Sequence, residues 1–361
     1  MAKTRILIVD DSVVIRRMIS KVIESDANME VAGVAANGRI ALQKISQINP
    51  DAITLDIEMP IMNGIETVKE IRKSHPKIPV IMFSTLSTQG AVATLEALAA
   101  GATDYVAKPA NVGNVTEGIG TLKNDLLPKI KAHFRPKAIR PSPPTTNAGP
   151  TKPAKRTFTP QLSGKFPPAV FCIGSSTGGP NALSDLFGAI KNKLPVPTFI
   201  VQHMPPLFTK MLADRLDKSS PNRFYEAEDG QIANPGCVYI APGGKHMEIS
   251  KDGNKIKIHL HKGPPENSCR PAVDVLFRSV ASVYGSSTLA AILTGMGSDG
   301  KRGCDVIKSK GGQIIAQDEE SCVVWGMPRA IADNDLADEI LPLDQIAPTI
   351  LRRMGNQKIV A

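Results

Sequence analysis

One short stretch of the chain, CIGSSTGGPNAL from Cys172, places two serines between glycines at the end of an apolar run. Residues 174–178 have the order G-x-S-x-G, in which glycines relieve crowding at a sharp turn and the following helix offers backbone amides to an oxyanion. The hydroxyl of Ser176 is therefore a candidate nucleophile. Two other interpretations stay open, a phosphate-binding loop and a plain glycine turn. Against the phosphate loop, the stretch lacks both the GxxxxGK[ST] lysine and the GxGxxG order.

A serine nucleophile needs a base and an acid that orients the base. His203 directly follows the apolar run PTFIVQ, and Asp299 is the only carboxylate in the glycine-rich turn after TLAAILT. Ser176, His203 and Asp299 are thus each expected just past a strand, as a catalytic triad requires. His259 and His261 alternate within KIKIHLH, where a structural or solvated role is expected. The order Ser, His, Asp differs from that of α/β-hydrolases, so their fold is not assumed.

A second group of polar residues follows apolar runs in the first half of the chain. Asp10 and Asp11 end the run TRILIVDD, and Asp56, Ser84 and Lys108 lie at the ends of the runs DAITLDI, PVIMFSTL and TDYVAKP. Ligands of open parallel sheets bind at the carboxyl ends of strands, so these side chains are expected to converge. Three carboxylates in one crevice require a cation, and oxygen ligands suit Mg²⁺. A nearby lysine and hydroxyl suit a phosphoryl group.

Apolar runs alternate with helix-length segments in both halves of the chain. This alternation predicts α/β folds, each a doubly wound parallel sheet with helices on both faces. The runs of the first half are TRILIVDD, DAITLDI, PVIMFSTL and TDYVAKP, and those of the second half are PAVFCIGSS, PTFIVQHM, GCVYIAPGG, TLAAILTGMG and GGQIIAQDE. The halves are not sequence repeats of each other. At 361 residues the chain is long enough for two domains.

A basic, proline-rich segment separates the two halves. Residues 129–165 contain nine Lys or Arg and no Asp or Glu, so the formal charge of +9 belongs to this segment and the rest sums to zero. It has no periodic apolar pattern, which predicts a linker between domains at 1–128 and 166–355. The second half has no basic helix, so nucleic acid is not an expected partner. We expect a soluble, cytoplasmic protein without membrane insertion, because the sequence has neither a long apolar run nor a signal peptide.

The set Asp10, Asp11, Asp56, Ser84, Tyr105 and Lys108-Pro109, with MPIMNG after Asp56, resembles the receiver domain of bacterial response regulators over about residues 3–125. The resemblance implies a flavodoxin-like fold in which Asp56 accepts a phosphoryl group from a histidine kinase. It also implies that Asp10 and Asp11 hold Mg²⁺ together with Asp56. Ser84 and Tyr105 would be the switch pair, and Lys108 the counter-ion of the phosphoryl oxygens.

The second half carries the motifs GSSTGGP, QHMPPLFT, YIAPGGKHM, RPAVDVLF, LTGMGSDG and AQDEESCVVWGMP. Over about residues 168–350 these resemble the catalytic domain of the chemotaxis protein-glutamate methylesterase family. The family commonly has alanine where this chain has Ser175. The resemblance implies a Rossmann-like, three-layer esterase without a metal cofactor. Its substrates would be methylated glutamates on the cytoplasmic helices of chemoreceptors, with deamidation of glutamine as a second activity.

Further expectations concern substrate binding and regulation. The backbone amides of Thr177 and Met296 are candidates for the oxyanion hole, and Arg270 and the loop of His246 are candidates for gripping the receptor helix. We expect the unphosphorylated receiver to lie over the Ser176 crevice and phosphorylation to weaken that interface. The alternative is a response regulator whose C-terminal domain binds a partner or is an esterase for small molecules. Five cysteines without a CxxC pair indicate reduced thiols, neither a disulfide framework nor a zinc knuckle.

Overall fold

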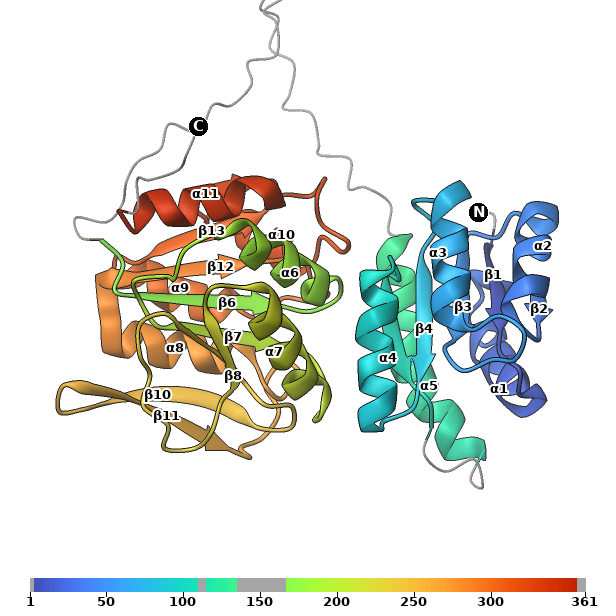
Figure 1. The fold of residues 1–361 in the computed structure, drawn as a ribbon, viewed down its shortest axis with the longest axis horizontal. Coiled ribbons are helices and arrows are strands. Elements are labelled where there is room, and N and C mark those ends of the chain that lie inside the picture. Colours follow the sequence, from blue (N-terminus) through green and yellow to red (C-terminus); the bar gives the residue numbers. More distant parts are fainter. Residues whose placement is uncertain (1–2, 110–114, 135–166, 356–361) are drawn as a thin grey trace, which may run out of the picture.

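The computed structural model describes residues 3–109, 115–134 and 167–355, which form two α/β units (Figure 1). The first is a five-stranded parallel sheet with the order β2-β1-β3-β4-β5. Its strands are β1 (Thr4–Val9), β2 (Met29–Ala35), β3 (Ala52–Asp56), β4 (Val80–Ser84) and β5 (Asp104–Ala107). Its helices are α1 (Val13–Glu24), α2 (Gly38–Ile48), α3 (Gly64–Ser74), α4 (Thr88–Ala99) and α5 (Val115–His133). The strand order confirms the expected flavodoxin-like fold.

Both faces of this sheet are covered, which explains its almost continuously apolar strands. Ile6 and Ile8 of β1 pack in one cluster with residues of α1 and α5. Leu7 and Val9 point to the opposite face and pack with residues of α2, α3 and α4. The alternation of side chains along a strand thus divides the apolar residues of β1 between two cores.

The second unit is a seven-stranded, entirely parallel sheet with the order β14-β13-β12-β6-β7-β9-β8. Its strands are β6 (Val170–Ser175), β7 (Thr198–Gln202), β8 (Arg223–Glu226), β9 (Cys237–Ile240), β12 (Thr288–Ile292), β13 (Gln313–Gln317) and β14 (Glu339–Leu341). A separate antiparallel hairpin joins β10 (His246–Asp252) to β11 (Lys255–His261). The expectation of a second doubly wound sheet is confirmed.

Helices cover both faces of this larger sheet as well. They are α6 (Gly179–Ala189), α7 (Phe208–Ser219), α8 (Val273–Tyr284), α9 (Lys301–Ser309), α10 (Met327–Ala332) and α11 (Leu343–Arg353), with a 3₁₀ turn at Gly285–Ser287. Buried residues of α6, α7 and α11 share one cluster, and those of α8, α9 and α10 share the other. The chain order reverses between β6 and β12, which is where ligands of such sheets bind.

The first unit extends beyond the boundary expected at residue 128. Helix α5 continues through Pro128 to His133, because Leu126, Leu127 and Ile130 bury their side chains in the cluster that contains α1. The predicted linker at 129–165 therefore begins inside a helix. Residues 135–166 lie outside the described residues. No helix in the described ranges is long and apolar enough to cross a membrane.

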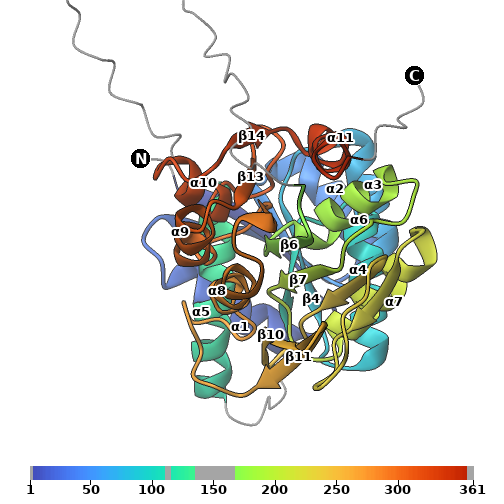
Figure 2. The same cartoon turned by 90° about the vertical axis from the view of Figure 1, so that its left-hand side faces the viewer.

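The two units contact each other through helices. Both views place α4 of the first unit beside α7 of the second (Figures 1 and 2), and α4 also packs against α6. One hydrophobic cluster continues across this contact, since it holds Leu95 of α4 together with Leu183 of α6 and Leu212 of α7. The contact lies next to the carboxyl end of β6, where the candidate nucleophile follows.

Candidate active site

The turn after β6 exposes one serine and buries the other. Ser175 is fully buried, and its hydroxyl donates a hydrogen bond to Oε1 of Gln202 at 2.7 Å. Ser176 is partly exposed, and its backbone N–H donates to the carbonyl of Thr294 at 3.0 Å. Gly178 turns the chain into α6 with φ +78°, a conformation that favours glycine. Ser176 is thus the serine whose hydroxyl can meet a substrate.

Gln202, the last residue of β7, holds the turn in place and was missed in the sequence. Its Nε2 donates to the carbonyl of Ser176 at 2.9 Å and to that of His203 at 3.2 Å. One amide side chain therefore fixes the backbone of both the candidate nucleophile and the candidate base. A polar residue at the buried end of an otherwise apolar strand was the signal available for it.

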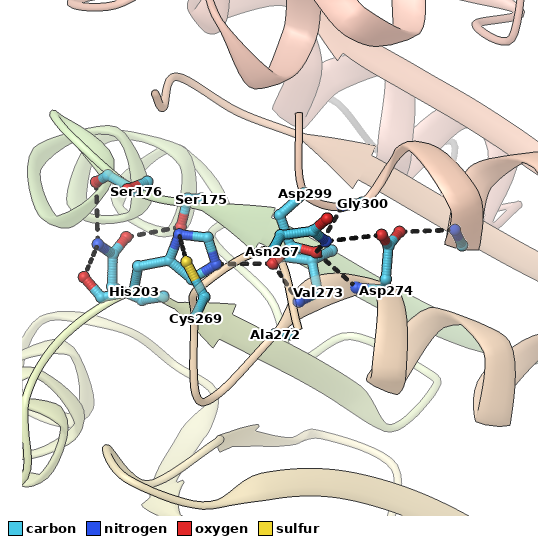
Figure 3. Close-up of polar contacts among 12 residues, drawn as sticks. Ser175, Ser176, His203, Asn267, Cys269, Ala272, Val273, Asp274, Asp299 and Gly300 are labelled. Atoms are coloured by element: carbon cyan, nitrogen blue, oxygen red, sulfur yellow. Dashed lines mark hydrogen bonds and ion pairs between the residues drawn. The ribbon is translucent and has the colours of Figure 1, made fainter. Parts of the chain in front are cut away.

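The partly exposed His203 and the buried Asp299 form a pair behind the turn. Nε2 of His203 lies 2.8 Å from Oδ2 of Asp299, whose side chain is 3% exposed (Figure 3). Burial opposes the charged ring, but the bond to Asp299 outweighs it and, with a contribution from Cys269, raises the pKa of His203 to about 9. Burial also opposes the charge of Asp299, yet His203 and backbone donors hold the pKa of this carboxyl below its ordinary value.

Further hydrogen bonds fix the carboxylate of Asp299. Asn267 donates from Nδ2 to Oδ1 of Asp299 at 2.8 Å and to Oδ2 of the buried Asp274 at 2.9 Å. The first backbone amide of α8, at Val273, donates to Oδ2 of Asp299 at 2.7 Å. A carboxylate that receives several N–H donors stays ionised, as an orienting acid must. Asn267 and Asp274 come from a loop and a helix with no triad-like spacing, and sequence reasoning missed both.

The remaining ring nitrogen of His203, Nδ1, lies 3.7 Å from the sulfur of Cys269. Ser176 and Asp299 lie on opposite sides of the imidazole (Figure 3). Within the described part of the chain the Ser176 hydroxyl has no hydrogen-bond partner, so a Ser176–His203 bond is not formed in this arrangement. Catalytic hydrogen bonds are often long before substrate binds, so this gap leaves the pair as a candidate.

Two backbone amides near Ser176 are free to face an oxyanion. The N–H groups of Thr177 and Met296 donate to no backbone acceptor in the ranges that the structure describes. Gly295 packs so closely on the turn that an added Cβ would lie 2.8 Å from Cβ of Ser176. The loop after β12 thereby brings its amides next to the candidate nucleophile.

His246 and Arg270, the two residues expected to contact the substrate, are both held by hydrogen bonds within the protein. The placement of His246 in a loop is wrong: it begins β10, is 1% exposed, and uses both ring nitrogens in hydrogen bonds to Pro264 and Ala272. This burial removes it as a group that grips a protein substrate. Arg270 is partly exposed and donates to the carbonyls of Lys262 and Gly263. These bonds tie its guanidinium to the neighbouring loop.

The acidic residues of the first unit converge at the β1–β3 switch point. Carboxylate oxygens of Asp10, Asp11 and Asp56 lie within 4.8 Å of one another. Nζ of Lys108 lies 2.7 Å from Asp56 and 3.6 Å from Asp10. Burial and the charge of Asp56 raise the pKa of Asp10 to about 6, and burial raises that of Asp56 despite Lys108.

One oxygen of each buried carboxylate in this group lacks a donor. Oδ2 of Asp10 and Oδ2 of Asp56 are buried without a hydrogen-bond partner. Orphaned anionic oxygens of this kind fit a hard, oxygen-seeking cation such as Mg²⁺. Asp10, Asp11 and Asp56 would hold it, and the ion would neutralise charge on an incoming phosphoryl group.

The predicted switch residues connect this group to the second unit. The Ser84 hydroxyl donates to the carbonyl of Gly90 at 3.1 Å and accepts from Thr94 at 2.6 Å, both on α4. Tyr105 is 7% exposed, because its ring stacks on that of Phe208 in α7 with centroids 5.0 Å apart. Both residues therefore contact helices that form the interface.

Among the residues that the structure describes, three hydrogen bonds cross that interface. The hydroxyl of Thr177, next to the candidate nucleophile, donates to Oδ2 of Asp104 at 2.7 Å. Asn181 donates to the carbonyl of Leu98 at 2.8 Å, and Arg215 donates to a further α4 carbonyl at 2.7 Å. The first unit thus binds directly to the turn that carries Ser176.

Comparison with known proteins follows the same division. Residues 6–119 match the response regulator receiver domain, and residues 171–350 match the CheB methylesterase family. A protein-glutamate methylesterase/protein-glutamine glutaminase of Nocardioides sp. is 50% identical over 356 residues, which cover 98% of this chain and 96% of that protein. The chain belongs to this methylesterase/glutaminase family. The corresponding protein of Trichodesmium erythraeum is 46% identical and covers 98% of this chain and 100% of its own length.

The second unit of the methylesterase also has a solved relative. The CheB methylesterase catalytic domain of Thermotoga maritima is 43% identical, with a TM-score of 0.51, and covers 52% of this chain and 99% of that domain. The chain is accordingly a chemotaxis methylesterase with a receiver domain, and the resemblance read from the sequence is confirmed. The alternative of a partner-binding, non-enzymatic second half is wrong.

Proposed function

We propose that this methylesterase hydrolyses glutamate methyl esters on the cytoplasmic helices of chemoreceptors, and that phosphorylation of its receiver activates it. The observation that carries the proposal is the hydrogen-bonded His203–Asp299 pair near the partly exposed Ser176, with the receiver bonded to the turn that holds Ser176. A base next to a serine supports acyl transfer, and the contact between the units supports control of access.

The proposed chemistry is an acyl transfer in two steps. In protein whose His203 ring is uncharged, Ser176 attacks the γ-carbonyl of the ester while Nδ1 of His203 accepts the hydroxyl proton, and the amides of Thr177 and Met296 bind the oxyanion. His203 then gives the proton to the leaving methoxide, which departs as methanol. Water attacks the acyl-enzyme, with His203 as base, and releases glutamate and Ser176. Asp299 fixes the ring and stabilises its cation throughout.

The same steps account for the proposed glutaminase activity. With a glutamine side chain the leaving group is ammonia in place of methanol, and the product is again glutamate. Amide nitrogen is a poorer leaving group than methoxide, so proton delivery by His203 matters more for this substrate. We propose no metal for either reaction in this domain.

For the receiver, we propose that a histidine kinase phosphorylates Asp56 with Mg²⁺ held by Asp10, Asp11 and Asp56. Lys108 would pair with the added oxygens, and Ser84 would turn toward them. Leaving its bonds to α4, Ser84 would disturb the helix that packs on α6 and α7. Tyr105 would then withdraw from Phe208, and the Asp104–Thr177 bond would break. The Ser176 turn would become free to bind the receptor helix.

Methanol release from methylated receptor membranes tests the catalytic proposal. Ser176→Ala is expected to abolish release, whereas the matched control Ser175→Ala is expected to retain most of it, because Ser175 is buried. Retained release by folded Ser176→Ala would refute the assignment. Activity on small esters with none on receptors would point instead to a small-molecule esterase.

Regulation is tested on the full chain with a small phosphodonor and Mg²⁺. The donor is expected to raise the rate of the unaltered protein and to leave Asp56→Asn unchanged. Equal rates with and without the donor, in protein shown to be phosphorylated, would refute the regulatory part alone.

A further inference from the structure

The side of the His203 ring away from Asp299 faces a thiol that the proposed reaction does not use. Sγ of Cys269 lies 3.7 Å from Nδ1 of His203 (Figure 3). Cys269 sits in the loop between β11 and α8, and its backbone is pinned there by paired bonds with Glu266 at 2.9 and 3.0 Å. Both residues are partly exposed to solvent.

The separation of these two atoms matches that of two ligands on one zinc ion. Bond lengths of about 2.0 Å to nitrogen and about 2.3 Å to sulfur place the N and S ligands of a tetrahedral Zn²⁺ about 3.5 Å apart. The observed 3.7 Å is close to this value, so little movement is needed to bind the ion. Imidazole and thiolate are also the ligand types that favour Zn²⁺ over Mg²⁺ or Ca²⁺.

Asp299 completes the arrangement as the partner of the ligating ring. A histidine that binds zinc usually donates its other N–H to a carboxylate, which orients the ring and increases its basicity. His203 has this partner at Nε2, 2.8 Å from Asp299. Although an oxygen of Asp299 lies within 4.8 Å of the other two groups, both its oxygens already accept N–H donors. It therefore supports the ring rather than binding the metal.

We propose that Zn²⁺ binds between Nδ1 of His203 and Sγ of Cys269 and inhibits the methylesterase. On binding, the Cys269 thiol and the protonated Nδ1 of the His203 ring each lose a proton to solvent, and the lone pair of Nδ1 becomes a metal bond. That lone pair is the one that accepts the Ser176 proton in the proposed reaction, so inhibition, unlike binding, rests on the proposed function. Two protein ligands hold zinc less firmly than four, so the inhibition is reversible.

Metal binding is tested on the full chain with Co²⁺ as a spectroscopic substitute for Zn²⁺. The unaltered protein is expected to show the near-ultraviolet band of a cobalt–thiolate bond, and added Zn²⁺ is expected to remove it. Cys269→Ala is expected to lack the band. The matched control is Cys237→Ala. Cys237 is also partly buried, and as the first residue of β9 it lies at the amino ends of the parallel strands, away from the site at their carboxyl ends. A missing band in the unaltered protein, or an equal band in Cys269→Ala, would overturn the proposal.

Inhibition is measured with excess Mg²⁺ present, so that the acidic site of the receiver stays filled. The zinc concentration that halves the methanol release of each variant, relative to its own zinc-free rate, is expected to rise at least tenfold in Cys269→Ala and to stay unchanged in Cys237→Ala. Equal sensitivity of all three proteins would refute the inhibitory role. A Cys269-dependent cobalt band in a protein without esterase activity would refute the proposed function and leave the metal site standing.

Discussion

Replacement of Asp299 by asparagine changes one oxygen to an NH₂ group in a site where every neighbour is a donor. Oδ2 of Asp299 accepts from His203 and from the amide of Val273, at 2.8 and 2.7 Å. Oδ1 accepts from three donors, the side chain of Asn267 and the backbone amides of Asp274 and Gly300. An asparagine side chain has one acceptor atom, so in either orientation its NH₂ group faces N–H donors that bond to a carboxylate oxygen in the unaltered protein.

The two orientations of the asparagine amide differ in the number of hydrogen bonds that are lost. With NH₂ at the Oδ1 position, three donors lose their acceptor. With NH₂ at the Oδ2 position, only the Val273 amide loses its acceptor, because His203 can switch tautomer and accept a hydrogen bond at Nε2. The second orientation is therefore favoured, and it places the ring hydrogen on Nδ1. A ring protonated at Nδ1 cannot accept the proton of Ser176.

The expected loss in kcat follows from this wrong tautomer. The same substitution in a serine protease triad costs about 10⁴ in rate, and at 1.36 kcal/mol per factor of ten that is roughly 5.5 kcal/mol of transition-state stabilisation. Because the buried Val273 amide is left without an acceptor, the free energy of unfolding is expected to fall by about 1–3 kcal/mol. The variant should consequently stay folded while losing nearly all activity.

The assay is methanol release from methylated receptor membranes by phosphodonor-activated protein, beside a denaturant unfolding curve of the same sample. Asn267→Ala serves as a comparison, because it removes one donor and leaves the carboxylate and the tautomer unchanged. It is expected to lose far less activity than Asp299→Asn. A folded Asp299→Asn protein that retains more than a tenth of the kcat would refute the tautomer argument.

Three further predictions concern packing, pH and the interface. Gly295→Ala is expected to lower kcat at least about 100-fold, because its Cβ would lie 2.8 Å from that of Ser176, whereas Gly188→Ala, in open space, should keep full activity in the methanol assay. Burial lowers the pKa of His203, but the bond to Asp299 outweighs it and raises the pKa to about 9, so protonation of the ring stabilises the fold. This contribution is complete below about pH 6.5 and is lost as the pH rises through 9. The destabilisation caused by His203→Gln, measured by denaturant unfolding, should therefore be larger at pH 6 than at pH 10; the opposite trend would contradict the pKa assignment. Arg215→Ala removes a charged hydrogen bond to α4, worth about 1.5–3 kcal/mol, and is expected to raise the basal rate about tenfold without phosphodonor; an unchanged basal rate would show that this bond does not hold the units closed.

The two sheets and their active edges could be predicted from the sequence. Most strands of the two sheets are apolar runs buried on both faces, and the polar residue that ends such a run stands at the carboxyl end of a parallel strand. The strands β2, β8 and β14 are more exposed and were not identified as apolar runs. This rule placed Asp10 and Asp56 together in the first unit. It also predicted Ser176, His203 and Asp299 at strand ends of the second unit, where His203 and Asp299 are bonded to each other. The domain boundary at 128 was less accurate, because buried residues continue the helical pattern of α5 beyond it.

Only the tertiary structure decided which side chains of a loop meet the site. The G-x-S-x-G order favours Ser176, but only the structure shows that Ser175 is buried and bonded to Gln202 of another strand. His246 lies among loop-forming residues in the sequence, yet a hairpin and a helix bury it. Cys269 is far from His203 along the chain and reaches it through a loop.

The sequence by itself determined most of the buried strands, the reactive groups at their ends and the division into two domains, because hydrophobic period and strand polarity are local properties of the chain. The tertiary structure decided the partners of those groups: Asn267 behind Asp299, Cys269 beside His203 and Asp104 on Thr177. These contacts join residues that are distant along the chain. Their distances depend on how helices pack on the sheets, and no local pattern encodes that packing.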